Sequence, residues 1–171
     1  MAKLVDATDL KSVSGNGVRV QFPPLAPRGN EITTRKQILA NFFQEVWNTG
    51  DADAAGRYLA PLYEIKHDPG DPWHGRTLSI AEFKERLTAS RAPFPQEHFT
   101  VVEMVEQDDV IAASWTWRGV HSVDIPDFPA TGREIAMSGI TLYYFEGDRL
   151  SGHWQIADRI GVMMQLQANR T

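Results

Sequence analysis

A change in the spacing of apolar residues divides this chain and limits the folds that it can adopt. In segments between residues 33 and 91, apolar residues recur every three or four positions, as in helices that bury one face. From Phe99 to Ala157 they alternate with polar residues, and turn sequences such as Gln107-Asp108-Asp109 separate the runs. Helices followed by consecutive hairpin-linked strands predict an α+β fold, with N-terminal helices packed on one face of a curved antiparallel sheet. The concave side of such a sheet is the expected ligand site.

Capping residues and turns give the expected boundaries. Thr33 or Thr34 and Asp51 precede the first two helical runs, and Ser79 with Glu82 forms a capping box for the third. The predicted strands are 62–67, 99–105, 110–121, 133–145 and 149–157, and an amphipathic helix is expected to begin at Asp158.

Composition narrows the function further. The chain has 171 residues, 42% hydrophobic and 23% charged, which is typical of one soluble globular domain. With no cysteine, it has no disulfide, thiolate zinc site or cysteine nucleophile. A net charge of −5 argues against a nucleic-acid partner, and no apolar run approaches the ~18 residues needed to span a bilayer. We therefore expect a cytoplasmic domain with neither a nucleic-acid nor a membrane partner.

The first 28 residues differ from the remainder. No helical or strand period persists there, and the segment is rich in Ser, Gly and Pro, so we expect residues 1–28 to be a non-domain tail and residues 29–171 to form the domain. Back-translation of this tail is compatible with parts of a leucine transfer-RNA gene. We therefore interpret the tail as read-through from such a gene, and genomic DNA whose codons do not fold as a cloverleaf would contradict that interpretation.

The last predicted strand carries the leading candidate for proton transfer. It runs through His153 and Trp154 to Asp158, and Asp158 shares the strand parity of Trp154. A carboxyl beside indole rings loses water, which raises its pKa toward the range useful for acid/base catalysis. The alternative is that Asp158 simply caps the following helix. His153 has the opposite parity, so we rank it lower.

Two further histidines and a set of aromatic residues complete the candidate site. His67 follows a short strand and His121 ends the strand face that carries two tryptophans, so both could assist a carboxyl in moving protons. A loop position for His67 and a surface position for His121 are the alternatives. Residues His67, Asp68, Asp71 and His74 match no compact metal-ligand spacing, so no metal is expected. The expected substrate-binding walls are Phe83, Trp115, Trp117, Tyr143 and Trp154.

Several short motifs follow one another in the order found in a known bacterial family. They lie between about residues 34 and 167 and comprise Val46-Trp47-Asn48-Thr49-Gly50-Asp51, His67-Asp68-Pro69, Arg118-Gly119-Val120-His121, Ala130-Thr131-Gly132-Arg133, Gly139-Ile140, His153-Trp154, Asp158 and Gln165-Leu166. In this order and spacing the chain resembles SnoaL-like proteins, the polyketide-cyclase-like branch of the NTF2-like (cystatin-like) superfamily.

This resemblance implies a cone-shaped fold, an apolar pocket for a small molecule, no cofactor and a homodimer formed through the sheet. Characterised cyclases of the family close a ring by an intramolecular aldol step, in which a carboxylate removes a carbon-bound proton and hydrogen-bond donors stabilise the enolate. The working aspartate of those cyclases directly follows the position that matches Trp154, where this chain has Gln155. An amide cannot accept that proton, so Asp158 or a histidine would have to replace the aspartate.

The sequence therefore favours a cofactor-independent acid/base enzyme that acts on a small apolar carbonyl compound, with cyclase-, isomerase- or lyase-type chemistry. Asp158 would carry the proton, and His67 and His121 would assist it. The alternative is a non-catalytic NTF2-like domain that binds a small molecule, because the superfamily also contains isomerases, dehydratases, epoxide hydrolases and binding domains. A dimeric interaction module with a residual cavity is a third possibility.

Overall fold

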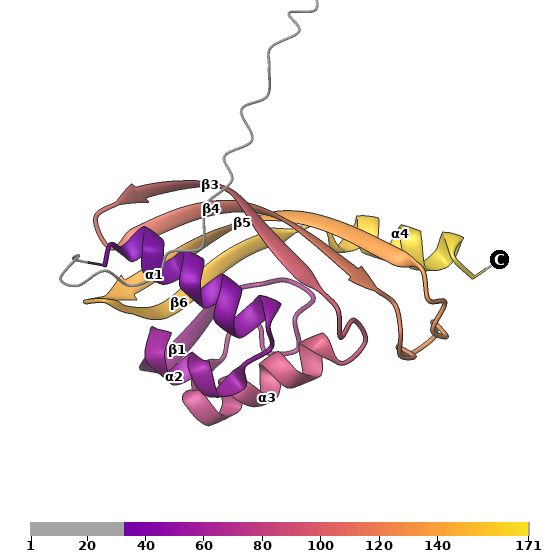
Figure 1. Ribbon diagram of the computed structural model, residues 1–171, viewed down its shortest axis with the longest axis horizontal. Coiled ribbons are helices and arrows are strands. Elements are labelled where there is room, and N and C mark those ends of the chain that lie inside the picture. Colours follow the sequence, from indigo (N-terminus) through magenta and orange to yellow (C-terminus); the bar gives the residue numbers. More distant parts are fainter. Residues whose placement is uncertain (1–32, 171) are drawn as a thin grey trace, which may run out of the picture. The chain divides into compact units, whose positions relative to one another are not determined.

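The computed structural model describes residues 33–170, and the predicted tail over residues 1–28 lies outside this range. In the described part, helices come first and long strands follow (Figure 1). The helices are α1 (Arg35–Phe42), the π-helical turn η1 (Phe43–Asn48), the 3-10 turn η2 (Ala52–Ala54), α2 (Ala55–Tyr58), α3 (Ile80–Arg91) and α4 (Arg159–Ala168). The strands are β1 (Leu59–His67), β2 (Thr77–Ser79), β3 (His98–Gln107), β4 (Val110–Val120), β5 (Glu134–Glu146) and β6 (Arg149–Ala157).

The helices begin where their capping residues predict. The Thr34 hydroxyl accepts a hydrogen bond from Gln37 N, and the Asp51 carboxylate accepts from Asp53 N and Ala54 N. Ser79 and Glu82 form the predicted capping box at α3. These bonds satisfy backbone N–H groups that have no partner within the first turn of a helix. The local sequence therefore determines where the helices start.

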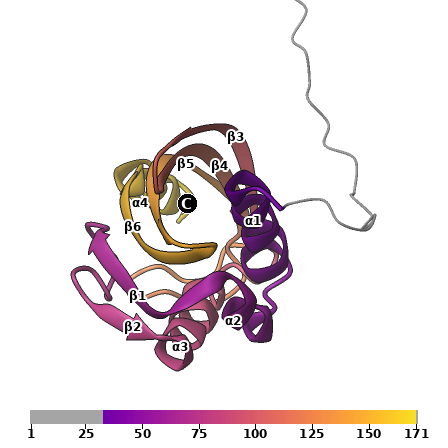
Figure 2. The ribbon, with the colours of Figure 1, turned by 90° about the vertical axis from the view of Figure 1, so that its left-hand side faces the viewer.

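One six-stranded sheet, in the order β2-β1-β6-β5-β4-β3, forms the body of the fold. β3, β4, β5 and β6 are joined as antiparallel neighbours, whereas β1 pairs with β6 in parallel. The short strand β2 was not predicted, and the α+β class with a mostly antiparallel sheet is confirmed. Figure 2 shows the sheet curling in cross-section while α1, α2 and α3 close its open side. The sheet therefore has an inner face that meets the helices and an outer face that does not.

Residue parity along the strands separates these two faces. On β4 the odd-numbered residues from Ile111 to Trp117 are buried, and the even-numbered residues are not. The buried aromatic and aliphatic side chains of the inner face pack against Leu39, Phe42, Val46 and Phe83 of the helices. On β6, His153 is buried and Trp154 is exposed. The inner face therefore carries His153 and not Trp154.

Helix α4 lies beyond the other helices, at one end of the sheet (Figure 1). Its Gln165 binds the backbone of β5 in two directions: Oε1 accepts from Ala136 N at 2.9 Å and Nε2 donates to Ala136 O at 2.7 Å. This paired amide attaches the helix to the strand in the way that a neighbouring strand would be attached.

Candidate functional site

An interior cavity of about 410 Å³ lies on the inner face of the sheet. Aromatic rings form much of its wall, and three of the predicted wall residues, Trp115, Trp117 and Tyr143, are among them. Trp47 and Phe99 add further rings from η1 and β3. A cavity of this size and lining is suited to a small, largely apolar and unsaturated molecule.

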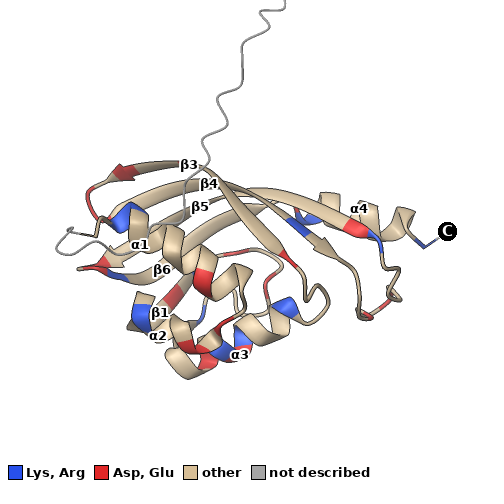
Figure 3. Cartoon of the chain, in the orientation of Figure 1, with Lys and Arg blue, Asp and Glu red and all other residues tan. Residues whose placement is uncertain are grey.

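The charged groups of the cavity do not come from the strands. The central parts of β4, β5 and β6 carry no Asp, Glu, Lys or Arg, and these parts are tan in Figure 3. The five charged residues of the cavity lie just outside strands or in helices: Asp68, Asp71, Arg86, Glu97 and Arg159. The site is therefore assembled from an apolar sheet and from polar groups that loops and helices bring to it.

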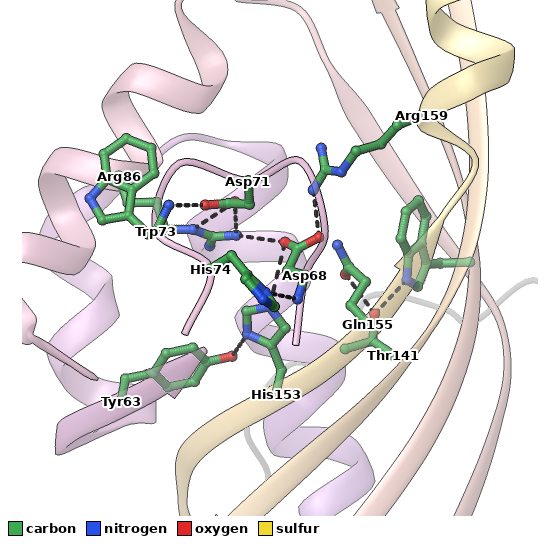
Figure 4. A network of polar contacts seen from close by, with 11 residues as sticks. Tyr63, Asp68, Asp71, Trp73, His74, Arg86, Thr141, His153, Gln155 and Arg159 are labelled. Carbon is green, nitrogen blue, oxygen red and sulfur yellow. Dashed lines mark hydrogen bonds and ion pairs between the residues drawn. The ribbon is translucent and has the colours of Figure 1, made fainter. Parts of the chain in front are cut away.

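Asp68 is the centre of the largest polar cluster (Figure 4). Its carboxylate is almost fully buried, with Oδ1 2.5 Å from Arg159 Nη2 and Oδ2 3.4 Å from Arg86 Nη2. Arg86 also binds Asp71 Oδ2 through Nη2 at 2.7 Å and through Nε at 3.1 Å. Although burial opposes the charged form, His153 and Arg159 hold the pKa of Asp68 well below its usual range. Two carboxylates and two guanidinium groups therefore balance one another in this wall of the cavity.

His153 lies between this cluster and Tyr63. The Tyr63 hydroxyl is 2.9 Å from His153 Nδ1, and Asp68 Oδ2 is 3.6 Å from His153 Nε2. Burial lowers the pKa of His153, which favours the neutral ring. In a neutral ring protonated on Nε2, Tyr63 donates to Nδ1, whereas Nε2 has no hydrogen-bond partner and lies 3.6 Å from Asp68 Oδ2.

Glu97 provides a second, separate acidic group in the cavity. It precedes β3, is 6% exposed, and accepts hydrogen bonds from Trp117 Nε1 to Oε2 at 2.9 Å and from Arg91 Nη1 to Oε1 at 3.2 Å. Burial outweighs these donors and raises the pKa of Glu97 to about 7. A carboxyl with such a pKa can both take and return a proton near neutral pH.

A chain of neutral hydrogen bonds crosses the inner face on three adjacent strands. Trp115 Nε1 on β4 donates to Thr141 Oγ1 on β5 at 2.9 Å, and Thr141 Oγ1 donates to Gln155 Oε1 on β6 at 2.7 Å. A Cβ at Gly139 would come within 2.4 Å of the Trp115 ring, so only glycine leaves room for the indole there. Gln155 and Trp115 both line the cavity.

The expected convergence of Asp158, His67 and His121 in one enclosed cavity is wrong. The Asp158 carboxylate is exposed and caps α4, where Oδ1 accepts from Gly161 N at 2.8 Å. It borders a groove on the outer face of the sheet and not the interior cavity. The predicted parity with Trp154 is correct, but both residues lie on the outer side.

His67 and Trp154 also lie away from the interior cavity. Their rings stack at 4.7 Å with an interplanar angle of 12°, and Trp154 is 37% exposed. Neither residue lines the interior cavity, so the wall predicted for Trp154 is not where the structure places it. The sequence predicts Trp154 on the inner face, but the outer face of this sheet is apolar too and accommodates the ring.

His121 and Phe83 are buried without reaching the cavity. His121 is 0% exposed, its ring centroid is 5.6 Å from that of Phe94, and neither ring nitrogen has a hydrogen-bond partner. The alternative of a surface histidine is therefore wrong for His121. Phe83 packs in the core against Tyr63, with ring centroids 5.2 Å apart. Neither residue borders the cavity.

Sequence reasoning missed most of the polar residues of the cavity. The sequence groups Asp68 and Asp71 with His67 and His74 as conceivable metal ligands, and among residues 33–170 no group of three or more His, Asp or Glu is arranged to hold a metal ion. Glu97 follows a Pro-rich turn after α3 and shows no pattern that distinguishes it from a surface glutamate. For Gln155 and His153 the sequence gives half of the signal: their shared parity places them on the face opposite to Ile156 and Trp154, but it does not say which face is the inner one.

An open groove of about 820 Å³ lies on the outer face of the sheet. Its floor carries the side chains of Val102, Ile140 and Ile156, and the first turn of α4 contributes Ile160. Ser114, Thr116 and Ser138 add hydroxyl groups.

In the described part of the chain, no helix is long and apolar enough to cross a bilayer.

Comparison with known proteins connects this geometry to relatives. The profile of the SnoaL-like polyketide cyclases matches residues 37–166. None of the curated proteins compared with the chain matches it. The family match covers every element from α1 to α4 apart from the ends of the two outermost helices.

Solved structures give a similar result. A proposed polyketide cyclase from Acidithiobacillus ferrooxidans is 47% identical, with a TM-score of 0.78, over 82% of this chain and 99% of that protein. Wild-type IdmH from Streptomyces antibioticus, also described as a proposed polyketide cyclase, is 25% identical with a TM-score of 0.67, over 78% of this chain and 98% of IdmH. A proposed SnoaL-like protein from Jannaschia sp. CCS1 shares the fold at 14% identity, with a TM-score of 0.66, over 83% of this chain and 99% of that protein.

Proposed function

Because this chain belongs to the SnoaL-like polyketide cyclase family, as its sequence motifs predict, we propose that it is an acid/base enzyme that acts on a small, apolar, carbonyl-bearing molecule in the interior cavity. The single observation that carries this proposal is the buried carboxyl of Glu97 at the wall of an aromatic cavity. Its environment suits proton transfer from carbon near neutral pH.

The proposed reaction begins with Glu97 as a carboxylate. One of its oxygens takes the proton from the carbon next to the carbonyl group, and the electron pair of that C–H bond moves to the carbonyl oxygen to give an enolate. The enolate carbon can then attack a second carbonyl of the same molecule, as in aldol closure, or regain a proton from Glu97, as in isomerisation. Trp117 and Arg91 hold the carboxylate in place during both steps.

In this proposal Glu97, and not Asp158, is therefore the residue that carries the proton. Trp115, Trp117 and Tyr143 remain the proposed walls for the substrate, because their rings border the same cavity. His153 and Tyr63 are the nearest neutral proton carriers on the side of Asp68. Gln155 leaves the family's aspartate position without a base, which is why a carboxyl from elsewhere in the cavity is required.

Proton exchange on a simple ketone tests the proposal without the natural substrate. We expect the protein to accelerate exchange of the acidic hydrogens of 2-tetralone in D₂O, followed by proton NMR. Glu97→Gln should slow the catalysed exchange by ~10²–10⁴-fold, the usual contribution of a positioned acid or base. Glu106→Gln, the same change at an exposed glutamate of β3, should leave the rate unchanged.

Two outcomes would contradict this proposal. Exchange by a folded Glu97→Gln variant at the rate of the unchanged protein would remove Glu97 from the reaction. Exchange no faster than in buffer would favour the alternative of a small-molecule-binding domain without catalysis.

We also propose that two copies of the chain associate through the outer groove. Val102, Ile140 and Ile156 expose apolar side chains there, and the central parts of β4, β5 and β6 carry no formal charge. A two-fold interface brings identical patches together, and the apolar floor of the groove brings no like charges into contact. Light scattering should find a dimer that Ile140→Arg converts to a monomer. Leu62→Arg, an exposed position outside the groove, should leave the dimer intact, and a dimeric Ile140→Arg variant would contradict this interface.

A further inference from the structure

The hydrogen-bond chain from Trp115 to Gln155 determines which end of the Gln155 amide is available to a ligand. An indole N–H can only donate, so Thr141 Oγ1 must accept from Trp115. Its own hydrogen is then available to Gln155 Oε1, which lies 2.7 Å away. With Oε1 engaged, Nε2 is the end of the amide that remains, and it carries two donor hydrogens.

The free end of this amide lies on the polar side of the cavity. In Figure 4 the amide nitrogen of Gln155 points away from Thr141, toward the side on which Asp68 and Arg159 lie. Gln155, Asp68 and Arg159 all line the interior cavity. The amide nitrogen therefore faces the part of the cavity where the ionic cluster is located.

Arg159 provides a second donor in the same region. Its Nη2 is engaged by Asp68 Oδ1 at 2.5 Å, but its Nε is buried without a hydrogen-bond partner. A buried donor without a partner is costly unless a ligand or water supplies an acceptor. Arg159 Nε is thus buried without an acceptor, and no hydrogen bond within the described residues engages Gln155 Nε2, so a molecule in the cavity can supply an acceptor to this region.

The nearby carboxylates do not cancel this preference for an acceptor. Asp68 faces Arg159 with one oxygen and Arg86 and His153 with the other, and Asp71 is bound by Arg86. The two carboxylates and two guanidinium groups balance, and burial lowers the pKa of His153, which favours its neutral form. Hydrogen-bond donors held in place beside a reacting group stabilise an oxygen that gains negative charge.

We propose that Gln155 Nε2 and Arg159 Nε form a subsite for the anionic oxygen of a planar, conjugated enolate or phenolate, with Trp115 and Thr141 as positioning residues that fix the amide. This inference rests on the proposed function and deepens it by naming the group that receives the developing charge. In this chain, the position that holds a base in the cyclases of the family is a donor to the enolate oxygen.

Binding of 2-naphthol tests the subsite directly. Its ionised form resembles the enolate of 2-tetralone and has its own absorption band, so the ionisation of the bound probe can be followed by titration. We expect the protein to bind the naphtholate at least tenfold more tightly than the neutral naphthol. Gln155→Leu should abolish that preference, while the affinity for naphthalene, which has no oxygen, stays unchanged.

Matched variants separate the subsite from general packing. Thr141→Val, which removes the bond that orients the amide, should lose part of the preference for the naphtholate. Gln167→Leu, at an exposed glutamine of α4, should retain all of it. If Gln155→Leu does not fold, Gln155→Glu supplies the same shape with an acceptor and should exclude the naphtholate.

The inference is overturned if the unchanged protein does not prefer the naphtholate, if the substituted Gln155 variants retain that preference, or if naphthalene binding falls equally. Failure of the subsite and failure of the proposed function are distinguishable. Glu97→Gln should lose exchange of 2-tetralone yet still bind the naphtholate. Exchange that depends on Glu97, together with unchanged naphtholate binding by Gln155→Leu, would overturn the subsite alone.

Discussion

The two faces of the sheet are made from the same strands but have different surroundings. On the inner face, Trp115, Thr141 and Gln155 meet helices and loops that bring Asp68, Arg86 and Glu97. On the outer face, Val102, Ile140 and Ile156 lie open. Both faces are rich in apolar side chains, and the central parts of β4, β5 and β6 carry no formal charge. What distinguishes the faces is therefore what packs against each of them.

This difference explains how a buried ionic site can form on an apolar sheet. A charge placed in the middle of a strand would cost folding free energy wherever the strand is covered. Here the charges come from the loop after β1, from α3, from the turn before β3 and from the first residue of α4. Each is paired in the site, as in the bonds from Arg86 to Asp71 and from Trp117 to Glu97.

The largest effect is expected from removal of the central charge of the inner face. Asp68→Asn leaves Arg159 and Arg86 without their shared carboxylate, and breaking a buried ion pair costs about 3–5 kcal/mol of unfolding free energy. The depressed pKa of Asp68 means that its stabilisation is present above its unfolded pKa of 3.8 and is lost as the pH falls below it. Urea unfolding of both proteins at pH 7 and pH 3 measures the difference. If Asp68→Asn lowers the unfolding free energy by less than 1 kcal/mol at pH 7, or by as much at pH 3 as at pH 7, the ion pairs of Asp68 do not stabilise the fold as proposed.

A matched pair of isoleucines on β5 compares the faces directly. Ile135 is 0% exposed on the inner face and Ile140 is 56% exposed on the outer face. Ile135→Ala should lower the unfolding free energy by roughly 2–5 kcal/mol because it creates a cavity in the core. Ile140→Ala should change the unfolding free energy by no more than about 0.5 kcal/mol when it is measured at concentrations at which the protein is monomeric. Equal costs in dilute protein would contradict the assignment of the two faces.

Most of the fold is predictable from sequence because local chemistry determines it. The caps at Thr34, Asp51 and Ser79 each act within three residues, and strand parity depends only on the alternation of side chains. The short strand β2 and the parallel pairing of β1 with β6 depend instead on contacts between distant segments. Neither leaves a signal within a local window of sequence.

The site is much less predictable, and the reason lies in the outer face. Parity groups Trp154, Ile156 and Asp158 together correctly, but it does not say which group faces inward. The more hydrophobic group of residues usually faces inward, but here both faces are apolar, so the sequence wrongly predicts Trp154 in the cavity and ranks His153 lower. Glu97 could not be found at all, because its burial depends on packing against Trp117 and Arg91 from other parts of the chain.

The pH dependence of stability should reveal Glu97 as a carboxyl of the inner face. Burial raises its folded pKa to about 7 from 4.5, so the folded protein binds this proton more tightly than the unfolded chain. The contribution is fully present below pH 4.5 and is lost as the pH rises through 7. As the pH rises from 5 to 8, we expect the unfolding free energy of Glu97→Gln to increase by about 3 kcal/mol relative to that of the unchanged protein. A difference that stays constant across this range would contradict the buried position, and Glu106→Gln should show no such trend.

The smallest effect is expected on the outer side, at Asp158. Its carboxylate caps α4 through Gly161 N, and replacing a capping side chain with alanine costs about 1 kcal/mol. Asp158→Asn should be nearly neutral because asparagine caps as well as aspartate does. This pair of variants separates the hydrogen bond from the charge, since a proton carrier would be lost in both and a cap only in the first. Thermal unfolding gives the stability of each variant, and 2-tetralone exchange gives the activity. A fall in exchange of tenfold or more in a folded Asp158→Asn variant would show that Asp158, at the outer end of β6, carries the proton. That result would contradict the proposal that proton transfer takes place on the inner face alone.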